Sequence, residues 1–266
     1  MIGEVPRRTP SGPLATQLRV IGALIMRELL TRFGRSRTGY FWLLAEPMML
    51  AISISSLHVL SGHDLPNGLP TFWFYAMGYT PFVMFRSIVN RGANVIDANM
   101  SLLYHRNITL LDLSIARNMM EAVVCSTIIL LFMTVAALFF DEWPHRPALF
   151  FLGLIESALL AHGFAMLLAS LEVFYEPVER FVHPITYMLM PISATFYMLS
   201  SLPYEAREAM LWNPIVHVHE MNRWAMFGDR IVPYYDISYV WLWIIGLNLL
   251  GMAGLRAARP RLTMME

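Results

Sequence analysis

The chain has 266 residues, of which 57% are hydrophobic and 14% are charged, and its formal net charge is zero. A soluble domain usually carries about 25% charged residues, so this composition argues against an ordinary soluble protein. The zero net charge gives no support for nucleic-acid binding. All 19 basic residues are arginine, and a single cysteine, Cys125, excludes an intrachain disulfide or a cysteine-based metal cluster.

The apolar residues fall in long uncharged runs. Six segments contain no Asp, Glu or Arg: 47–63, 65–85, 122–140, 157–171, 181–204 and 237–255. A transmembrane helix needs about 20 mostly apolar residues. Four runs are long enough unaided, and two become so when extended across Glu46 or Glu156. Because the runs do not alternate, they indicate helices rather than strands. We therefore predict an all-α membrane protein with six transmembrane helices, at about 40–60, 68–88, 118–140, 148–171, 181–200 and 237–256.

The segment before the first span, residues 1–39, is basic and polar, with no cleavable signal peptide in view. Apolar residues recur in it at three- and four-residue spacing: Leu14, Leu18, Ile21, Ile25 and Leu29. This spacing predicts an amphipathic helix lying in the membrane interface. A basic anchor that only sets topology is an equally good interpretation, and the two are compatible.

Arginines are distributed unequally between the connections, and cytoplasmic loops are expected to hold the excess. Fifteen lie in the N-terminal segment, the second-to-third and fourth-to-fifth connections and the C-terminal end. The other side has four, namely Arg146, Arg207, Arg223 and Arg230. This asymmetry predicts that both termini are cytoplasmic, including the tail at 257–266.

Residues 201–236 are too polar for a span. Pro203, Pro214 and Pro233 divide the stretch, and Trp212 and Trp224 are amphipathic anchors. Irregular backbone at membrane depth must be buried in protein or line a wet cavity. We expect short re-entrant helices that dip from the outer face; the alternative is an ordinary external loop.

The sequence lacks the common motifs of enzymes that would act without a partner chain. A Walker loop requires a lysine, and the sequence has none; any ATP-driven role therefore needs a partner chain. The Gly-x-Ser-x-Gly and His-Glu-x-x-His patterns are also absent. His217 and His219 are two residues apart and cannot share a helix face. We interpret them as hydrogen-bonded groups rather than metal ligands.

Charged residues within the spans are candidates for function. Glu46 opens the first span beside Pro47, and Glu156 lies within the fourth. Either could couple transport to protons. The structural alternative for Glu156 is an internal polar contact, to His162 or across a helix interface, and we favour it.

Aromatic residues make up 13% of the chain and concentrate at the span ends. They are typical of an interfacial belt. A surface that stacks against sugar rings is the functional alternative, and the sequence alone does not separate the two.

Three segments in order resemble the KpsM-type permeases that export capsular polysaccharide, a branch of the ABC type-2 exporters. Residues 26–47 read MRELLTRFGRSRTGYFWLLAEP and resemble the interface helix and the start of the first span. Residues 96–117 are similar to the cytoplasmic connection that docks the ATPase. Residues 211–220, LWNPIVHVHE, resemble an Asn-Pro-x-x-His-x-x-Glu element of the external re-entrant region. The likeness runs from about residue 20 to 230.

The resemblance implies an inner-membrane permease subunit that is not itself an enzyme. It would form a homodimer with two copies of an ABC ATPase, which would bind the ATP and Mg, and this chain would need no cofactor. The cargo would be a lipid-linked acidic polysaccharide, passed to periplasmic and outer-membrane export proteins. O-antigen or teichoic acid is an alternative cargo, and a proton-coupled secondary transporter is a distant alternative function.

The resemblance also assigns roles to residues. The expected ATPase-docking residues are Asn99, Tyr104, His105, Arg106 and Asn107. The candidates for contact with the substrate or a lipid head group are Arg32, Arg35, Arg37, Tyr40, Trp42 and Glu46. The candidates for the re-entrant region or gate are Tyr197, Trp212, Asn213, Pro214, His217 and Glu220.

Overall fold

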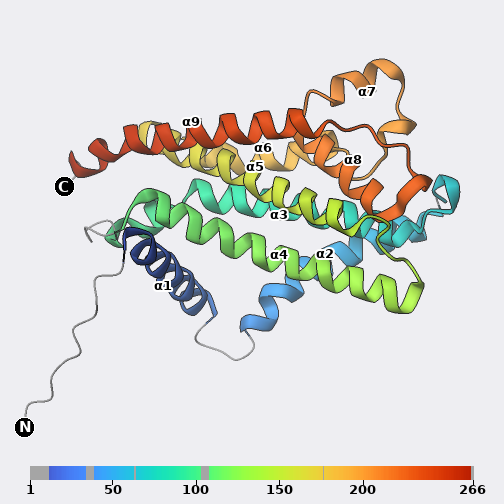
Figure 1. The fold of residues 1–266 in the computed structure, drawn as a ribbon, viewed down its shortest axis with the longest axis horizontal. Coiled ribbons are helices and arrows are strands. Elements are labelled where there is room, and N and C mark those ends of the chain that lie inside the picture. Colours follow the sequence, from blue (N-terminus) through green and yellow to red (C-terminus); the bar gives the residue numbers. More distant parts are fainter. Residues whose placement is uncertain (1–11, 34–38, 63, 103–107, 176, 265–266) are drawn as a thin grey trace, which may run out of the picture.

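A computed structural model of the chain describes residues 12–33, 39–62, 64–102, 108–175 and 177–264 (Figure 1). The described residues form nine α-helices and five short 3-10 helices, with no strand among them, which confirms the all-α prediction. The α-helices are α1 (Pro13–Phe33), α2 (Gly39–Leu60), α3 (Thr71–Ala93), α4 (Leu110–Phe140), α5 (Pro147–Phe174), α6 (Val178–Leu189), α7 (Tyr204–Met210), α8 (Pro214–Phe227) and α9 (Ile237–Met264). The 3-10 helices are η1 (Pro66–Gly68), η2 (Asp97–Leu102), η3 (Pro191–Ser193), η4 (Leu199–Ser201) and η5 (Gly228–Arg230).

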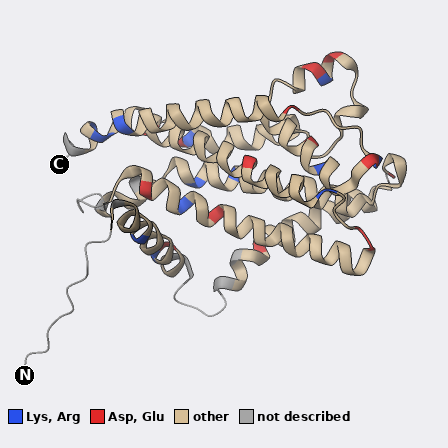
Figure 2. Cartoon of the chain, viewed as in Figure 1, with Lys and Arg blue, Asp and Glu red and all other residues tan. Residues whose placement is uncertain are grey.

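Three helices, α4, α5 and α9, are long and apolar enough to cross a membrane. A shorter apolar stretch, Leu44–Leu60, makes up most of α2. Long parts of the helices are tan in Figure 2, which marks stretches without Lys, Arg, Asp or Glu. These three helices support the prediction of a membrane protein, while the count of six spans stays a prediction.

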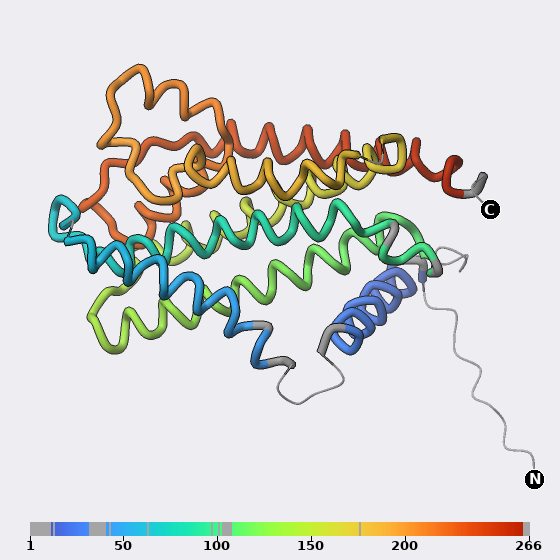
Figure 3. Tube along the Cα trace, turned by 180° about the vertical axis from the view of Figure 1, so that it is seen from behind, coloured from blue at the N-terminus to red at the C-terminus, as the bar shows by residue number. Residues whose placement is uncertain are grey.

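The helices are arranged around α3. This helix packs against α2, α4, α5 and α6, and α5 packs along most of α9. The connections 61–70, 141–146 and 190–236 gather at one end of the bundle, which we call the α7 end. Helix α1, η2 and the C-terminal end of α9 gather at the opposite end, the α1 end (Figures 1 and 3).

Local sequence signals explain where α4 begins. Thr109 accepts a hydrogen bond from the Asp112 backbone N–H, and the Asp112 carboxylate accepts one from the Thr109 backbone N–H. This reciprocal capping box satisfies backbone donors that a helix start leaves unpaired. Helix α4 therefore begins eight residues before the span expected at 118, and its first three turns or so precede the uncharged run 122–140.

Glycines allow α5 and α9 to approach closely. A Cβ atom at Gly251 would lie 2.7 Å from the Met166 Cβ atom, and one at Gly163 would lie 2.8 Å from the Leu247 Cβ atom. Neither position has room for a side chain. Small residues at such contacts favour helix association in lipid, where tight packing replaces the hydrophobic effect.

The fifth expected helix is shorter than the predicted range 181–200. Helix α6 ends at Leu189 and is followed by η3 and by Ala194, whose φ of 54° is left-handed. Twelve residues of α-helix span only about 18 Å. The chain then continues irregularly to α7, so the apolar run 181–204 is not a single helix. Sequence hydropathy does not report this break, because buried polar contacts cause it.

The region expected to hold short re-entrant helices contains α7 and α8. Helix α7 carries exposed residues and forms a projection at the α7 end, whereas nearly all of α8 is buried against α5, α9 and α3 (Figure 1). The part of this region that forms α8 is therefore a buried helix and not an ordinary external loop.

Helix α1 lies across the α1 end of the bundle (Figure 1). Leu24 is buried, and Ile21 and Ile25 pack partly against the same apolar cluster. Leu14 and Leu18, from the predicted stripe, are exposed. The inner part of the stripe therefore packs on protein, and insertion of the helix into a membrane interface remains a prediction.

Candidate functional site

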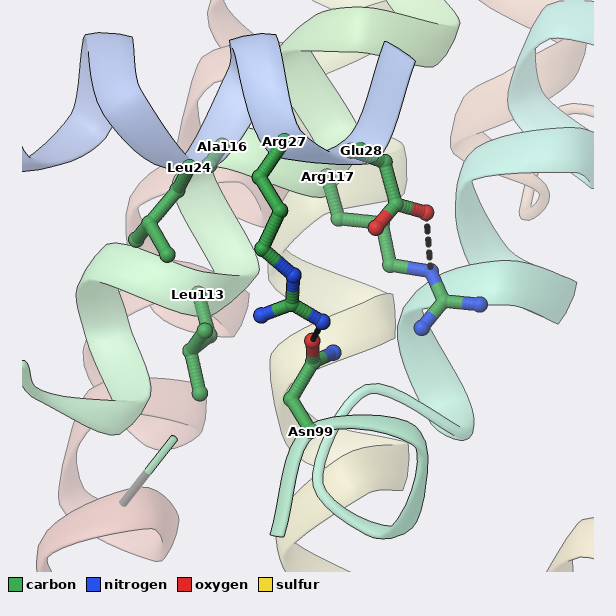
Figure 4. A pocket seen from close by; sticks show the side chains of 7 residues that line it. All are labelled: Leu24, Arg27, Glu28, Asn99, Leu113, Ala116 and Arg117. Atoms are coloured by element: carbon green, nitrogen blue, oxygen red, sulfur yellow. Dashed lines mark hydrogen bonds and ion pairs between the residues drawn. The ribbon is translucent and has the colours of Figure 1, made fainter. Parts of the chain in front are cut away.

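At the α1 end, the described part of the connection expected to dock an ATPase packs against α1 and α4. Leu24 of α1 packs with Val95 and Ile96, which precede η2, and with Leu113 and Ala116 of α4. This apolar cluster fixes α1 over the η2 connection. The three elements enclose a small pocket, with polar groups on one side and aliphatic groups on the other (Figure 4).

Polar contacts join the same three elements. Arg27 of α1 donates a hydrogen bond of 3.0 Å to the Asn99 side-chain oxygen in η2. Asn99 in turn donates to the Val95 carbonyl at 2.9 Å. Glu28 of α1 faces Arg117 of α4 at 3.9 Å (Figure 4). A displacement of η2 would therefore act directly on α1.

Asn99 is the one expected docking residue within the described part of the chain. Its side chain is buried and directed at α1, so it holds the connection in place from the inside. Tyr104, His105, Arg106 and Asn107 lie outside the described residues.

Most of the residues expected to contact the substrate or a lipid head group cannot be placed, because they or their side chains lie outside the described residues. Arg35 and Arg37 lie outside the described residues, as do the side chains of Arg32 and Tyr40. Trp42 and Glu46 are exposed on α2. Their assignment as substrate or head-group contacts stays a prediction.

The start of α8 explains the Asn-Pro pair of the motif. The Asn213 side chain accepts a hydrogen bond from the Ile215 N–H at 3.1 Å, and it donates one to the Ile192 carbonyl at 2.9 Å. Pro214 occupies the first helical position, where no N–H is needed. Asn213 thus caps α8 and ties it to the segment after α6.

His217 holds backbone on two sides. Its Nε2 atom lies 2.8 Å from the Leu211 carbonyl, and its Nδ1 atom accepts a hydrogen bond from the Asp236 N–H at 2.9 Å. These partners require the tautomer protonated at Nε2. His217 is therefore a structural group that fixes both connections around α8.

Glu220 and Arg223 form the buried polar centre of α8. Arg223 is 1% exposed and donates to the Thr195 and Tyr197 carbonyls, each at 2.5 Å. Glu220 is fully buried, lies 3.8 Å from Arg223, and accepts from the Leu199 N–H at 3.2 Å. We call this arrangement the Arg223 latch. It pairs the backbone groups that the break after α6 leaves open, as a low-dielectric interior requires.

The latch also needs space on α3. The Arg223 guanidinium lies 4.4 Å from the centre of the Phe74 ring. A Cβ atom at Gly78 would meet the Thr195 carbonyl at 2.5 Å and Arg223 Nη2 at 2.8 Å. Only glycine leaves room for the irregular chain and the guanidinium at this position.

Most of the residues expected in the re-entrant region or gate lie on α8 or contact it. Asn213, Pro214 and His217 order α8, and Tyr197 and Glu220 take part in the latch. Trp212 is separate, because its side chain is 79% exposed. Sequence reasoning missed Arg223, counting it among the arginines of the outer side. Its position one helical turn after Glu220, in an otherwise apolar stretch, was the available signal.

Glu156 is fully buried on α5. Its expected partner, His162, instead bonds Asn118 of α4 at 2.7 Å. Neither Glu156 carboxyl oxygen has a hydrogen-bond partner among the described residues. A polar contact of Glu156 across a helix interface therefore stays a prediction.

Comparison with known proteins places these features in a family. The ABC-2 type transporter family matches residues 19–227, which include most of α1, η2 and all of α8. The capsule polysaccharide export inner-membrane protein BexB of Haemophilus influenzae is 33% identical over 242 residues, covering 90% of this chain and 91% of that protein. CtrC, a protein of the same description from Neisseria meningitidis serogroup B, is 34% identical over 243 residues, with the same coverage. The polysialic acid transport protein KpsM of Escherichia coli is 27% identical over 88% of this chain and 91% of its own length. The resemblance seen in the sequence is confirmed, and the chain belongs to the ABC-2 type transporter family.

Proposed function

We propose that this chain is the membrane-spanning subunit of an ATP-driven exporter that moves lipid-linked acidic capsular polysaccharide across the bacterial inner membrane. The observation that carries the proposal is similarity to capsule-export proteins over about nine-tenths of both lengths. The polysialic acid relative supports an acidic polymer as cargo. The chain acts as a homodimer and passes the polymer to periplasmic and outer-membrane export proteins.

ATP hydrolysis belongs to a separate ATPase with its own Mg, because the sequence contains no lysine for a Walker loop. Two copies of that ATPase bind the α1 end, which faces the cytoplasm along with both termini. The chain crosses the membrane six times, by α2, α3, α4, α5, the segment of α6 with 190–203, and α9. The arginine excess on the connections of the α1 end supports this orientation.

Docking is the first step of the mechanism. The ATPase engages the connection at 96–107, and its closure displaces η2. The contact of Asn99 with Arg27 carries the displacement to α1, and that of Glu28 with Arg117 carries it to α4. The dimer then opens a path for the polymer between the two copies.

A deletion strain tests the proposal as a whole. Loss of the gene is expected to leave capsular polymer inside the cell, and expression of the intact chain with its ATPase is expected to restore surface polymer. Polymer reaching the surface at the normal level in the deletion strain would contradict the proposal. Accumulation of O-antigen instead would favour the other cargo, which an O-antigen export permease of Myxococcus xanthus, 24% identical over 83% of the chain, also supports.

The docking segment has its own test. Tyr104→Ala combined with Arg106→Ala is expected to lower the ATPase activity of the complex and the export rate while the membrane chain stays folded. Glu208→Ala, at an exposed position of α7 on the opposite end of the bundle, is the control. Unchanged ATPase stimulation and export in the double variant would remove the docking assignment.

A further inference from the structure

Arg86 is an arginine within a helix that the proposed function places in the membrane. It lies 15 residues after the start of α3 and seven before its end, or about 22 Å and 10 Å along the helix axis. Charged residues at such depth are costly, and they pair with other groups or mark a functional pathway. The surroundings of Arg86 therefore decide which of these two it does.

Other arginines around the bundle face carboxylates. Arg91 lies 3.3 Å from Glu121, and Arg223 lies 3.8 Å from Glu220. Arg86 makes no ion pair with any residue that the structure describes. Its Nε atom is buried and has no hydrogen-bond partner among those residues. The positive charge of Arg86 is thus not matched by an anion within the described chain.

Aromatic groups surround this charge instead. The Arg86 guanidinium carbon lies 3.5 Å from the centre of the Tyr187 ring of α6, and Tyr187 is 56% exposed. Tyr79 lies two helical turns before Arg86 on the same face of α3, and its side chain is 3% exposed. One phenol ring and one guanidinium therefore meet where α3 packs on α6.

The site is held in place before any ligand arrives. Thr186, beside Tyr187, donates a hydrogen bond of 2.9 Å to the Asn90 side chain, one turn after Arg86. Tyr79 stacks on Phe196 with ring centres 6.3 Å apart and planes at 13°. These contacts hold the parts of α6 and α3 that carry Tyr187 and Arg86. Binding would need little reordering of side chains, and such preorganisation favours affinity.

The chemistry of this arrangement suits an oxyanion. A guanidinium stacked on an aromatic ring keeps its edge N–H donors available, and these donors match the geometry of a carboxylate. The exposed Tyr187 ring offers an apolar surface for the C–H face of a sugar, and phenol hydroxyls can donate to its oxygens. A neutral polymer would leave the guanidinium unmatched.

We propose that Arg86 and Tyr187 form a binding site for the carboxylate of an acidic sugar unit in the exported polymer. The inference rests on the proposed function and assigns the residues that distinguish acidic from neutral polymers. A phospholipid phosphate offers the same oxyanion chemistry, and the experiment below separates the two sources.

Binding by the complete transporter, this chain with its ATPase, tests the site. The complex is placed in phosphatidylcholine nanodiscs, and the probes are oligosialic acid and its carboxyl-reduced form. The wild type is expected to bind the acidic oligomer more tightly. Arg86→Gln is expected to weaken binding of the acidic oligomer about tenfold, with little change for the reduced one. Arg86→Lys keeps the charge but loses the planar guanidinium, so its affinity for the acidic oligomer is expected to lie between those of the wild type and Arg86→Gln.

Further variants separate loss of the binding site from misfolding of the chain. Arg256→Gln removes an exposed charge from α9 and is expected to bind both probes like the wild type. Tyr187→Leu is expected to weaken binding through loss of the stacked ring, whereas Tyr187→Phe retains most of it. Arg86→Lys also keeps the site testable if Arg86→Gln does not fold.

Three results would overturn the site. In the first, the wild type has no preference for the acidic oligomer. In the second, Arg86→Gln or the folded Arg86→Lys retains the full preference. In the third, phosphatidylglycerol in the nanodiscs abolishes oligomer binding by occupying Arg86, which identifies a lipid as the ligand. Each leaves the proposed function intact as long as the chain restores surface polymer in the deletion strain, so the two failures are distinguishable.

Discussion

At the residue scale, the buried polar groups of α8 explain the break after α6. An irregular segment inside a membrane protein needs partners for its N–H and C=O groups. Arg223 supplies two donors to the Thr195 and Tyr197 carbonyls, and Glu220 accepts from the Leu199 N–H. The charges also face one another, which lowers the cost of burying them.

Removal of the Arg223 guanidinium is expected to destabilise the chain. Arg223→Met should cost about 3 kcal/mol, because it leaves Glu220 as a buried unpaired charge and two carbonyls without donors. The measurement is the heat-induced loss of folded protein in detergent, followed by size-exclusion chromatography. Arg256→Met on the exposed face of α9 is the control and should stay within about 0.5 kcal/mol. Equal midpoints for the two variants would contradict the latch.

A methyl group at Gly78 is expected to disturb the same contact from the α3 side. In Gly78→Ala the new Cβ atom would lie 2.5 Å from the Thr195 carbonyl, and overpacking of this kind costs about 1–3 kcal/mol. Gly246→Ala in α9 is the matched control, since nothing lies within 4 Å of its Cβ position; a better helix former there should be neutral or slightly stabilising. The same thermal assay compares them, and a stable Gly78→Ala variant would count against this packing.

At the element scale, the sequence predicted the long helices well and the short ones poorly. The apolar runs behind α4 and α9 are uninterrupted, and the one behind α5 is broken only by Glu156, so hydropathy reports these long helices directly. Helix α6 ends early because groups more than 20 residues away, on α8, bind the chain after it. No local pattern contains that information.

The candidate sites show the same division. The start of α8 depends on local chemistry, because the Asn213 side chain caps the helix and Pro214 fits its first position. The roles of Arg27 and Asn99 depend on α1 packing over η2, 72 residues along the chain. The unmatched charge of Arg86 is likewise visible only once α6 is placed against α3.

The contact between α1 and η2 is expected to transmit motion between these elements. Arg27→Ala and Asn99→Ala should each lower ATP-dependent export, and the double variant should be no worse than either one. That outcome corresponds to a coupling energy of about 1 kcal/mol, or about fivefold in rate. Export assays on the four proteins of this cycle make the measurement. Reductions that multiply in the double variant would mean that the two residues act independently.

At the scale of the whole molecule, the proposed orientation rests on two independent features. The arginine excess lies on the connections of the α1 end, which is the pattern of cytoplasmic loops. The same end holds both α1 and the last turn of α9 (Figure 1), as an even number of crossings requires. Helix α8 lies within the bundle, with Asn222 buried, although it connects two segments of the α7 end.

Cysteine labelling tests this topology in one set of variants. Cys125 is buried, so Cys125→Ala provides a background without thiols. In spheroplasts, an impermeant maleimide is expected to label Glu208→Cys on exposed α7 but not Ala257→Cys on the exposed face of α9. Inverted vesicles should reverse the result, because the proposed topology places the two positions on opposite sides of the membrane. Asn222→Cys should resist labelling from both sides until the protein is denatured, since α8 is enclosed by α3, α5 and α9. Labelling of Ala257→Cys in intact spheroplasts would reverse the orientation, and rapid labelling of Asn222→Cys would place α8 in an external loop.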